Sequence, residues 1–253
     1  MRQATALLYL TMPSPSLEKS RSFYEKVLQW EMEDGSGHIE STSTPCGLSP
    51  AFDDEDGTQI YLSVYNLDDA LDTLKQAGGR VLYRDSFSIG ECAFCMDNQG
   101  TQFALQEPAD EHMREQAMFN QKGYRHGDLF RFVLPVRNIE KAMDFYGEVM
   151  GWTFDDKGMI SNVNGPQGCL TQAGRKSKRR PVFWFQVESV DEAKDLVMEV
   201  GGEASEIVDA SCGKMCTCKD DQGVEFVVIE RPESDFVPIS EIQTITITKP
   251  FDQ

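Results

Sequence analysis

The sequence predicts an α+β fold built from two copies of one module. Three observations predict it: a self-match between 13–34 and 135–156, a second self-match between two turns further along each copy, and helix-period and strand-period patterns that follow in the same order in both copies. The matching pairs are Phe23-Tyr24 and Phe145-Tyr146, Trp30 and Trp152, and the turns Asp97-Asn-Gln-Gly100 and Asp220-Asp-Gln-Gly223. Each copy spans roughly 105 residues, which is enough for a unit with its own core.

The self-match sets the domain boundaries that we expect. The chain divides into a first module, a connector, a second module and a C-terminal tail, which cover 1–108, 109–127, 128–232 and 233–253. The connector is acidic at its start and then rich in Gln, Asn and Gly. The tail alternates Ile and Thr over 245–248, which predicts an extra edge strand.

Copy one begins with a predicted strand over 5–12 and a helix over 17–29, with Ser16 as its N-cap. A weakly patterned stretch over 38–52 and a strand over 59–66 follow. Asp68 or Asp69 caps a second helix, which Gly78-Gly79 ends. Three strands over 81–87, 91–96 and 101–107 close the copy.

Copy two repeats this order of elements. The predicted elements are a strand over 129–134, a helix over 139–150 after Asn138, a strand over 181–187, a helix over 191–200 and a last strand over 224–230.

Composition excludes several classes of partner. The net charge of −18 leaves no basic face for a phosphate backbone, so we expect no nucleic-acid partner. No apolar run approaches the roughly 18 residues of a membrane span, so we expect no membrane partner.

The first residues lack the apolar region of a signal peptide, which makes the cytoplasm the expected location. We expect a monomer or a homodimer.

The seven cysteines have no framework spacing, which is typical of free thiols. Two groups stand out, Cys92 with Cys95 and Cys212 with Cys216 and Cys218. A metal or redox site is one interpretation of them. We favour the other, that they are small buried hydrophobic residues, because both groups lie in strand-like segments without a thioredoxin-like context.

The predicted strands have two different faces. One face is apolar and is expected to pack under the helices; its residues are Leu8, Leu10, Met12, Ile60, Leu62, Val64, Phe103 and Leu105, with Phe130, Phe132, Leu134, Phe183, Phe185, Val187, Phe226 and Val228 in copy two. The other face mixes aromatic and hydrogen-bonding residues, which is typical of a small-molecule cleft. A solvated sheet face is the alternative.

The second face supplies the candidate site residues. The candidate ligand-binding residues are Tyr9, Gln59, Tyr61, Gln102 and Trp184. Arg131 and Glu225 are the candidate catalytic residues, and they would be neighbours if the first and last strands of copy two lie side by side. Such a pair could bind a carboxylate or polarise a carbonyl; a structural ion pair is the alternative.

These patterns resemble a module of the vicinal oxygen chelate superfamily, which includes glyoxalase I, bleomycin-resistance proteins and extradiol dioxygenases. The resemblance lies in the Glu-Lys, Phe-Tyr and Trp positions of the first helix of each copy, in the Gly-Gly stop of the second helix and in the turn before the last strand. It covers about 5–108 and 129–232. It implies tandem βαβββ modules whose curled mixed sheets pair around a shared cleft.

The resemblance also implies where a metal would bind. Metal-dependent members place His or Gln on the first strand, Glu on the last, and in dioxygenases a further His on a middle strand. The corresponding residues here are Tyr9 and Arg131, Ala104 and Val227, and Gln59 and Val182. None is His, so we expect no metal and no cofactor. A two-residue slip would instead bring Gln102 and Glu225 onto the ligand face.

The resulting prediction is a two-module, glyoxalase-like protein that binds a small organic molecule in the cleft without a metal. Two further hypotheses stay open. One is a metal-dependent lyase, isomerase or dioxygenase of the same superfamily, and the other is a drug-sequestering protein of the resistance type. The sequence leaves open whether the protein is an enzyme.

Overall fold

The computed structural model describes residues 6–50, 57–87, 89–110, 125–163, 166–174 and 179–230. Most of the predicted connector and all of the predicted tail, including the edge strand expected over 245–248, lie outside these residues. Among the described helices, none is both long and apolar enough to cross a membrane.

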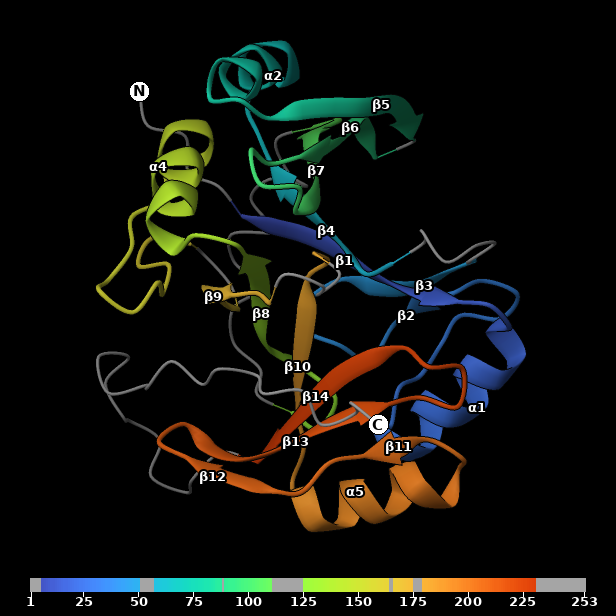
Figure 1. The fold of residues 1–253 in the computed structure, drawn as a ribbon. Coiled ribbons are helices and arrows are strands. Elements are labelled where there is room, and N and C mark those ends of the chain that lie inside the picture. Colours follow the sequence, from blue (N-terminus) through green and yellow to red (C-terminus); the bar gives the residue numbers. More distant parts are fainter. Residues whose placement is uncertain are drawn as a thin grey trace. The chain divides into compact units, whose positions relative to one another are not determined.

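Both copies contain the predicted strands and helices in the predicted order (Figure 1). The elements of copy one are β1 (Leu7–Ser14), α1 (Leu17–Val27), β2 (His38–Ile39), β3 (Cys46–Pro50), β4 (Gln59–Ser63), α2 (Leu67–Gln76), β5 (Arg80–Phe87), β6 (Gly90–Met96) and β7 (Gln102–Pro108). Those of copy two are β8 (Leu129–Val136), α4 (Ile139–Met150), β9 (Gln167–Gln172), β10 (Val182–Gln186), α5 (Val190–Glu199), β11 (Glu203–Ala204), β12 (Val208–Ala210), β13 (Gly213–Lys219) and β14 (Glu225–Glu230).

The strands form two mixed seven-stranded sheets, which confirms the predicted α+β class. The first sheet has the order β2-β3-β1-β4-β7-β6-β5, with β1 antiparallel and β7 parallel to β4. The second has the order β11-β13-β14-β10-β8-β9, and β12 also pairs with β13. In both copies the middle strand of the repeat therefore lies between the first strand and the last.

The residues cluster into two compact units, each of which takes segments from both sequence copies. Unit 1 contains β1 up to Thr11, β4, α2, β5 to β7, the end of β8 from Phe132, α4 and β9. Unit 2 contains the rest of β1, α1, β2, β3, β8 up to Arg131, β10, α5 and β11 to β14. The first helix of each copy is thus packed with elements of the other copy, whereas the predicted modules 1–108 and 128–232 describe the sequence repeat.

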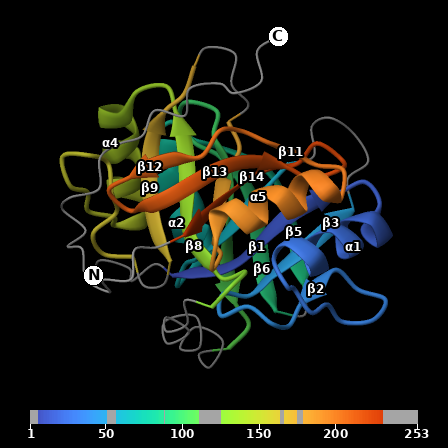
Figure 2. The same cartoon turned by 90° about the horizontal axis from the view of Figure 1, so that it is seen from below.

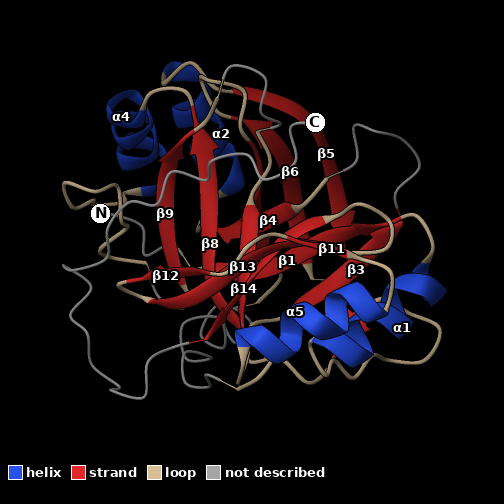
Figure 3. Cartoon of the chain, turned by 60° about the horizontal axis from the view of Figure 1, so that its bottom comes forward, coloured by secondary structure: helices blue, strands red, loops and turns tan. Residues whose placement is uncertain are grey.

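Each unit contains one pair of helices. In unit 1, α2 packs against α4 and covers β5, β6 and β7. In unit 2, α1 packs against α5, and α5 lies along β13 and β14 (Figures 2 and 3). Every residue of the predicted apolar face is buried except Leu8, because a register shift between Leu7 and Tyr9 turns Leu7 toward the core in its place.

The self-matching residues hold these helices to the sheets. In unit 1, the Tyr146 hydroxyl of α4 donates to Asp97 Oδ2 at 3.2 Å, while Asp97 Oδ1 accepts the backbone N–H groups of Gln99 and Thr101, both at 2.8 Å. Burial, with the nearby Asp97 charge, raises the pKa of Tyr146 well above its ordinary value. The tyrosine and the turn that recur in the sequence are therefore the two sides of one contact.

Unit 2 repeats the contact with the copies exchanged. The Tyr24 hydroxyl of α1 donates to Asp220 Oδ2 at 3.0 Å, and Asp220 Oδ1 accepts the N–H groups of Gln222 at 2.9 Å and Val224 at 2.8 Å. Burial raises the pKa of Tyr24 well above its ordinary value and also raises the pKa of Asp220. Phe226 of β14 packs on Tyr24, with ring centroids 5.7 Å apart.

The helix caps agree in part with the sequence. Asn138 caps α4 as predicted, and its side chain accepts the N–H of Lys141 at 2.8 Å. Ser16 occupies the N-cap of α1, but its side chain makes no capping hydrogen bond. The prediction of Asp68 or Asp69 as the cap of α2 is wrong, because Asn66 takes that position and accepts the Asp69 N–H at 2.8 Å.

Candidate functional site

Unit 1 brings four of the candidate ligand-binding residues onto adjacent strands. Tyr9 pairs with Tyr61, and Tyr61 pairs with Ala104, so these three residues form one row across β1, β4 and β7. The Tyr9 and Tyr61 rings meet edge to face with centroids 6.0 Å apart, and Tyr61 meets Phe94 of β6 in the same way at 5.9 Å. Burial is the main cause that raises the pKa of Tyr61 to about 12.

The two glutamines of this group lie beside the row. Gln59 is opposite Thr11 of β1, is buried, and donates from Nε2 to the Ile60 carbonyl at 3.3 Å. Gln102 begins β7 and is half-buried, and its backbone N–H donates to the Arg179 carbonyl at 3.2 Å. This group therefore offers aromatic edges with hydrogen-bonding side chains next to them, as the sequence predicts for this face.

Unit 2 places Arg131 in an aromatic setting. The guanidinium carbon of Arg131 lies 5.1 Å from the ring centroid of Phe130 and 5.1 Å from that of Trp184. Both Arg131 and Trp184 are only 3% exposed. Contacts of this kind stabilise a cation by roughly 0.5–2 kcal/mol, with the larger values where water is excluded.

The indole of Trp184 adds a second feature to this site. Among the residues that the structure describes, its buried Nε1–H has no hydrogen-bond acceptor. A buried donor without an acceptor is unfavourable by roughly 1–3 kcal/mol. The Arg131 charge also affects Cys212: burial raises the pKa of that thiol, and the nearby guanidinium opposes the increase.

The prediction that Arg131 and Glu225 are neighbours is wrong. The sheet order places β10 between β8, which carries Arg131, and β14, which begins with Glu225. Glu225 is exposed and lies opposite Lys219 of β13. The middle strand separates the two residues because β10 pairs in parallel with β14, as β4 does with β7.

The candidate residues thus form two groups, one in each compact unit. Tyr9, Tyr61, Gln59 and Gln102 belong to unit 1, whereas Arg131 and Trp184 belong to unit 2. Sequence reasoning missed Phe94, which lies opposite Ala104 in the ladder between β6 and β7. Phe94 lies two residues after Cys92 on a predicted strand, so the two side chains project from the same face, and this alternation was the available signal. A cleft shared by the two groups stays a prediction.

The residues at the positions that metal-dependent members use do not fit a metal. In copy two these are Arg131, Val182 and Val227. A guanidinium only donates hydrogen bonds, and Val has no donor atom for a metal. Copy one offers Tyr9, Gln59 and Ala104. Within the described ranges, no cluster of three or more His, Cys, Asp or Glu could hold a metal ion.

The described histidines lie away from the positions that metal-dependent members use. His126 lies in unit 2, where Nε2 is 3.0 Å from the Val27 carbonyl and Nδ1 accepts the Glu188 N–H at 3.4 Å. His38 is exposed on the two-residue strand β2. His112 lies outside the described residues.

The fold belongs to a known class, that of tandem vicinal oxygen chelate modules. A catechol 2,3-dioxygenase structure matches with a TM-score of 0.60 at 16% identity, covering 97% of this chain and 94% of the other. The Mn(II)-bound glyoxalase from Novosphingobium aromaticivorans matches with a TM-score of 0.59 at 13% identity, covering 98% and 92%. The 2,3-dioxygenase LapB from Pseudomonas sp. KL28 matches with a TM-score of 0.54 at 16% identity, covering 94% and 96%.

A family model matches the second copy. Residues 128–228 match the model of the Glyoxalase/Bleomycin resistance protein/Dioxygenase superfamily. This match, together with the fold, confirms the resemblance predicted from the sequence. A comparison with curated protein sequences found no match.

Proposed function

We propose that this glyoxalase-like protein binds a small organic carboxylate at Arg131 and Trp184, without a metal at that site. The observation that supports the proposal is a buried guanidinium 5.1 Å from two aromatic rings, beside a buried indole N–H that lacks an acceptor among the described residues. A guanidinium fork matches the geometry of a carboxylate, and the indole N–H is a further donor for the same anion. The aromatic rings give an organic ligand an apolar wall.

Three residues would bind the carboxylate, each in a different way. Arg131 holds the carboxylate, Trp184 orients it with its N–H, and the ring of Phe130 excludes water from the guanidinium. Because water is excluded, the attraction between the opposite charges is stronger than at the protein surface. Glu225 has no part in it, since it is exposed on another strand.

The test is a thermal-shift titration with aromatic carboxylates and 2-oxo acids, each beside its neutral amide. We expect the carboxylates to raise the melting temperature in a concentration-dependent way, because a ligand that binds only the folded state stabilises it. The amides should give no shift. Arg131→Gln should abolish the shift, and Trp184→Phe, which keeps a ring but loses the N–H, should weaken binding by about 10–150-fold.

A matched control is Arg80→Gln, because Arg80 is an exposed arginine of β5. It should bind like the wild type. Equal shifts in the wild type and in Arg131→Gln, or equal binding of carboxylates and amides, would refute the proposal. So would a stoichiometric divalent ion in the untagged protein whose removal abolishes carboxylate binding.

A further inference from the structure

Two cysteines of β13 form a thiol pair on the helix-covered side of the second sheet. Cys216 and Cys218 are two positions apart on one strand, so their side chains project from the same face. They lie opposite Val228 and Phe226 of β14, on the face that α5 covers. Their neighbour Thr217 is opposite Val227, on the face of Trp184. The pair is therefore separate from the proposed carboxylate site.

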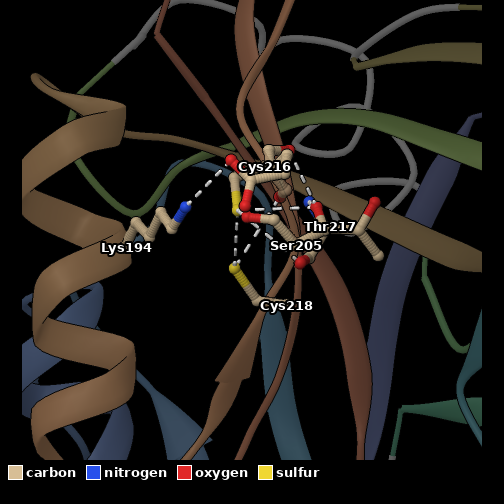
Figure 4. Close-up of polar contacts among 6 residues, drawn as sticks. Lys194, Ser205, Cys216, Thr217 and Cys218 are labelled. Carbon is tan, nitrogen blue, oxygen red and sulfur yellow. Dashed lines mark hydrogen bonds and ion pairs between the residues drawn. The ribbon is translucent and has the colours of Figure 1, made fainter. Parts of the chain in front are cut away.

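The two sulfur atoms are close and well surrounded (Figure 4). The Cys218 Sγ donates to Cys216 Sγ at 3.9 Å, and Cys216 Sγ lies 3.3 Å from the Ser205 carbonyl and 3.8 Å from the Ser205 hydroxyl. Lys194 of α5 lies beside the pair, and its ammonium group forms an ion pair with Glu206 Oε2 at 3.9 Å. Both thiols are buried, with exposures of 1% and 0%.

The surroundings shift the pKa values of the two thiols in opposite directions. The hydrogen bond from Cys218 is the largest cause that lowers the pKa of Cys216 to about 7, and the Ser205 hydroxyl and the Lys194 charge act in the same direction. The pKa of Cys218 is raised, because its proton lies in that hydrogen bond. The Cys218 thiol is directed at the Cys216 sulfur, and the space between the two sulfur atoms is one that a cation could take.

We propose that Cys216 and Cys218 form a bis-thiolate site for a soft d10 metal ion of low coordination number, with Cu(I) as the best fit. Thiolate ligands favour Cu(I), zinc and iron–sulfur clusters over harder metal ions. With metal–sulfur distances of about 2.3 Å, two sulfurs lie roughly 3.8 Å apart at a tetrahedral angle and about 4.6 Å apart in a linear arrangement. The observed 3.9 Å lies within this range. The proposal does not rest on carboxylate binding.

The number of ligands distinguishes Cu(I) from zinc. Structural zinc takes four protein ligands. Among the described residues no third His, Cys, Asp or Glu joins the pair. The Ser205 oxygens near Cys216 are hard ligands that a soft ion does not favour, so the pair suits an ion that two thiolates satisfy.

The strand also disfavours a disulfide between the same residues. A disulfide needs Cβ atoms about 3.5–4.5 Å apart. The Cβ atoms of two residues that are two positions apart on a strand are separated by roughly 6.6–6.8 Å, because the strand rises about 3.3–3.4 Å per residue. The side chains can bring their sulfurs to chelating distance while the backbone stays extended, but a covalent bond would require the strand to distort.

The pair lies close to an edge of the second sheet. β13 is covered at this point by β11, which has two residues, and β12, which has three. Ser205 joins them and pairs with Thr217 through its backbone N–H at 2.9 Å and its hydroxyl at 3.1 Å. Short edge strands open at low free energy, so local opening of this segment would admit a small ion.

Copy one contains a natural comparison. Cys95 of β6 lies opposite Phe103 as Cys218 lies opposite Phe226, but the position that corresponds to Cys216 is Ala93. Cys95 is therefore a single buried thiol, and burial raises its pKa to about 12. The repeat thus shows that Ala is tolerated at this position of the fold, and it supplies a matched control thiol.

The test is anaerobic titration of the reduced full-length chain with Cu(I) against a chromogenic Cu(I) chelator. The wild type should withhold one equivalent of Cu(I), and X-ray absorption should show two sulfur neighbours. Cys216→Ala and Cys218→Ser should each weaken binding by more than the roughly 10–100-fold that loss of an outer-shell partner costs. Cys95→Ser should bind like the wild type, and Zn(II) should not bind in stoichiometric amount.

Cys216→Ala should fold like the wild type in the absence of metal, as checked by circular dichroism and melting temperature, because Ala93 occupies the equivalent position. Three results would overturn the proposal: no Cu(I) withheld by the wild type, retention by Cys216→Ala and Cys218→Ser equal to that of the wild type, or loss of binding in Cys95→Ser. A disulfide in the tryptic peptide 215–219 after mild peroxide treatment, with no Cu(I) binding in the reduced protein, would also overturn it.

Discussion

Replacing Tyr146 by Phe removes one hydroxyl from the contact that joins α4 to the turn at Asp97. The ring stays in place, so its stacking on Trp152, with centroids 5.2 Å apart, is kept. Asp97 keeps the two backbone N–H donors on Oδ1 but loses the donor on Oδ2 at 3.2 Å. The substitution therefore removes a single hydrogen bond to a buried carboxylate.

The expected cost follows from that hydrogen bond. A hydrogen bond to a charged group contributes about 1.5–3 kcal/mol, so the free energy of unfolding should fall by about that amount. For a chain of this size the melting temperature falls by roughly 2–4 °C per kcal/mol, which gives a decrease of about 3–12 °C. Tyr24→Phe should have a similar effect, because Tyr24 makes the equivalent contact with Asp220 at 3.0 Å.

The assay is urea unfolding followed by tryptophan fluorescence and circular dichroism. A double-mutant cycle with Asp97→Asn isolates the pair, because the Asn side chain can still accept the two backbone N–H groups through its carbonyl oxygen. In that background Tyr146→Phe should cost less than about 0.5 kcal/mol. Tyr65→Phe is the control, since Tyr65 is 44% exposed.

Two results would refute the reasoning. One is a Tyr146→Phe protein as stable as the wild type to within about 0.5 kcal/mol. The other is an equal cost of Tyr146→Phe with and without Asp97→Asn, which would show that the hydroxyl acts through another contact.

Three further predictions concern the same fold. Burial raises the pKa of Asp220, so the folded state holds the proton of this carboxyl more tightly than the unfolded state does. In urea titrations, the unfolding free energy of the wild type relative to Asp220→Asn should therefore fall as the pH rises from about 3.9 through the raised pKa, and an increase would contradict this. Gly90→Ala should lower the free energy of unfolding by more than about 2 kcal/mol, because Gly90 has a φ of +128° and a Cβ there would lie 2.0 Å from the Glu107 carbonyl oxygen. An unchanged melting temperature would exclude this close approach. Asn138→Ala should cost about 1 kcal/mol through loss of its cap, and Ser16→Ala less, because the Ser16 side chain makes no capping bond; equal costs would contradict the observed caps.

Much of the fold could be predicted from the sequence, because its strongest signals are local or repeated. Strand alternation and helix periodicity depend on neighbours in the chain, and they gave the elements and most of the buried face. Leu8 is an exception, since the register shift beside Tyr9 depends on pairing with β4. The cap of α2 was also missed, because Asn66 and the two following aspartates are all good capping residues.

The candidate site was predicted less completely, because it depends on strand order. The sequence identified Arg131 and Trp184 as residues of one face, and the structure brings the guanidinium to 5.1 Å from the indole ring. Pairing Arg131 with Glu225 required β8 and β14 to be adjacent, which no sequence pattern specifies. The parallel pairing of β10 with β14 places a strand between them.

By itself, the sequence determined the repeat, the order of elements and the burial of the cysteines, since all three depend on residue type and spacing. Only the tertiary structure decided which copy each first helix packs with: α1 lies in the unit of α5, and α4 in the unit of α2. It alone decided that Cys216 and Cys218 bring their sulfurs to 3.9 Å. The physical reason is that two equivalent copies offer equivalent local surfaces, so the choice between them is made by long-range contacts such as Tyr24 with Asp220, which no local pattern encodes.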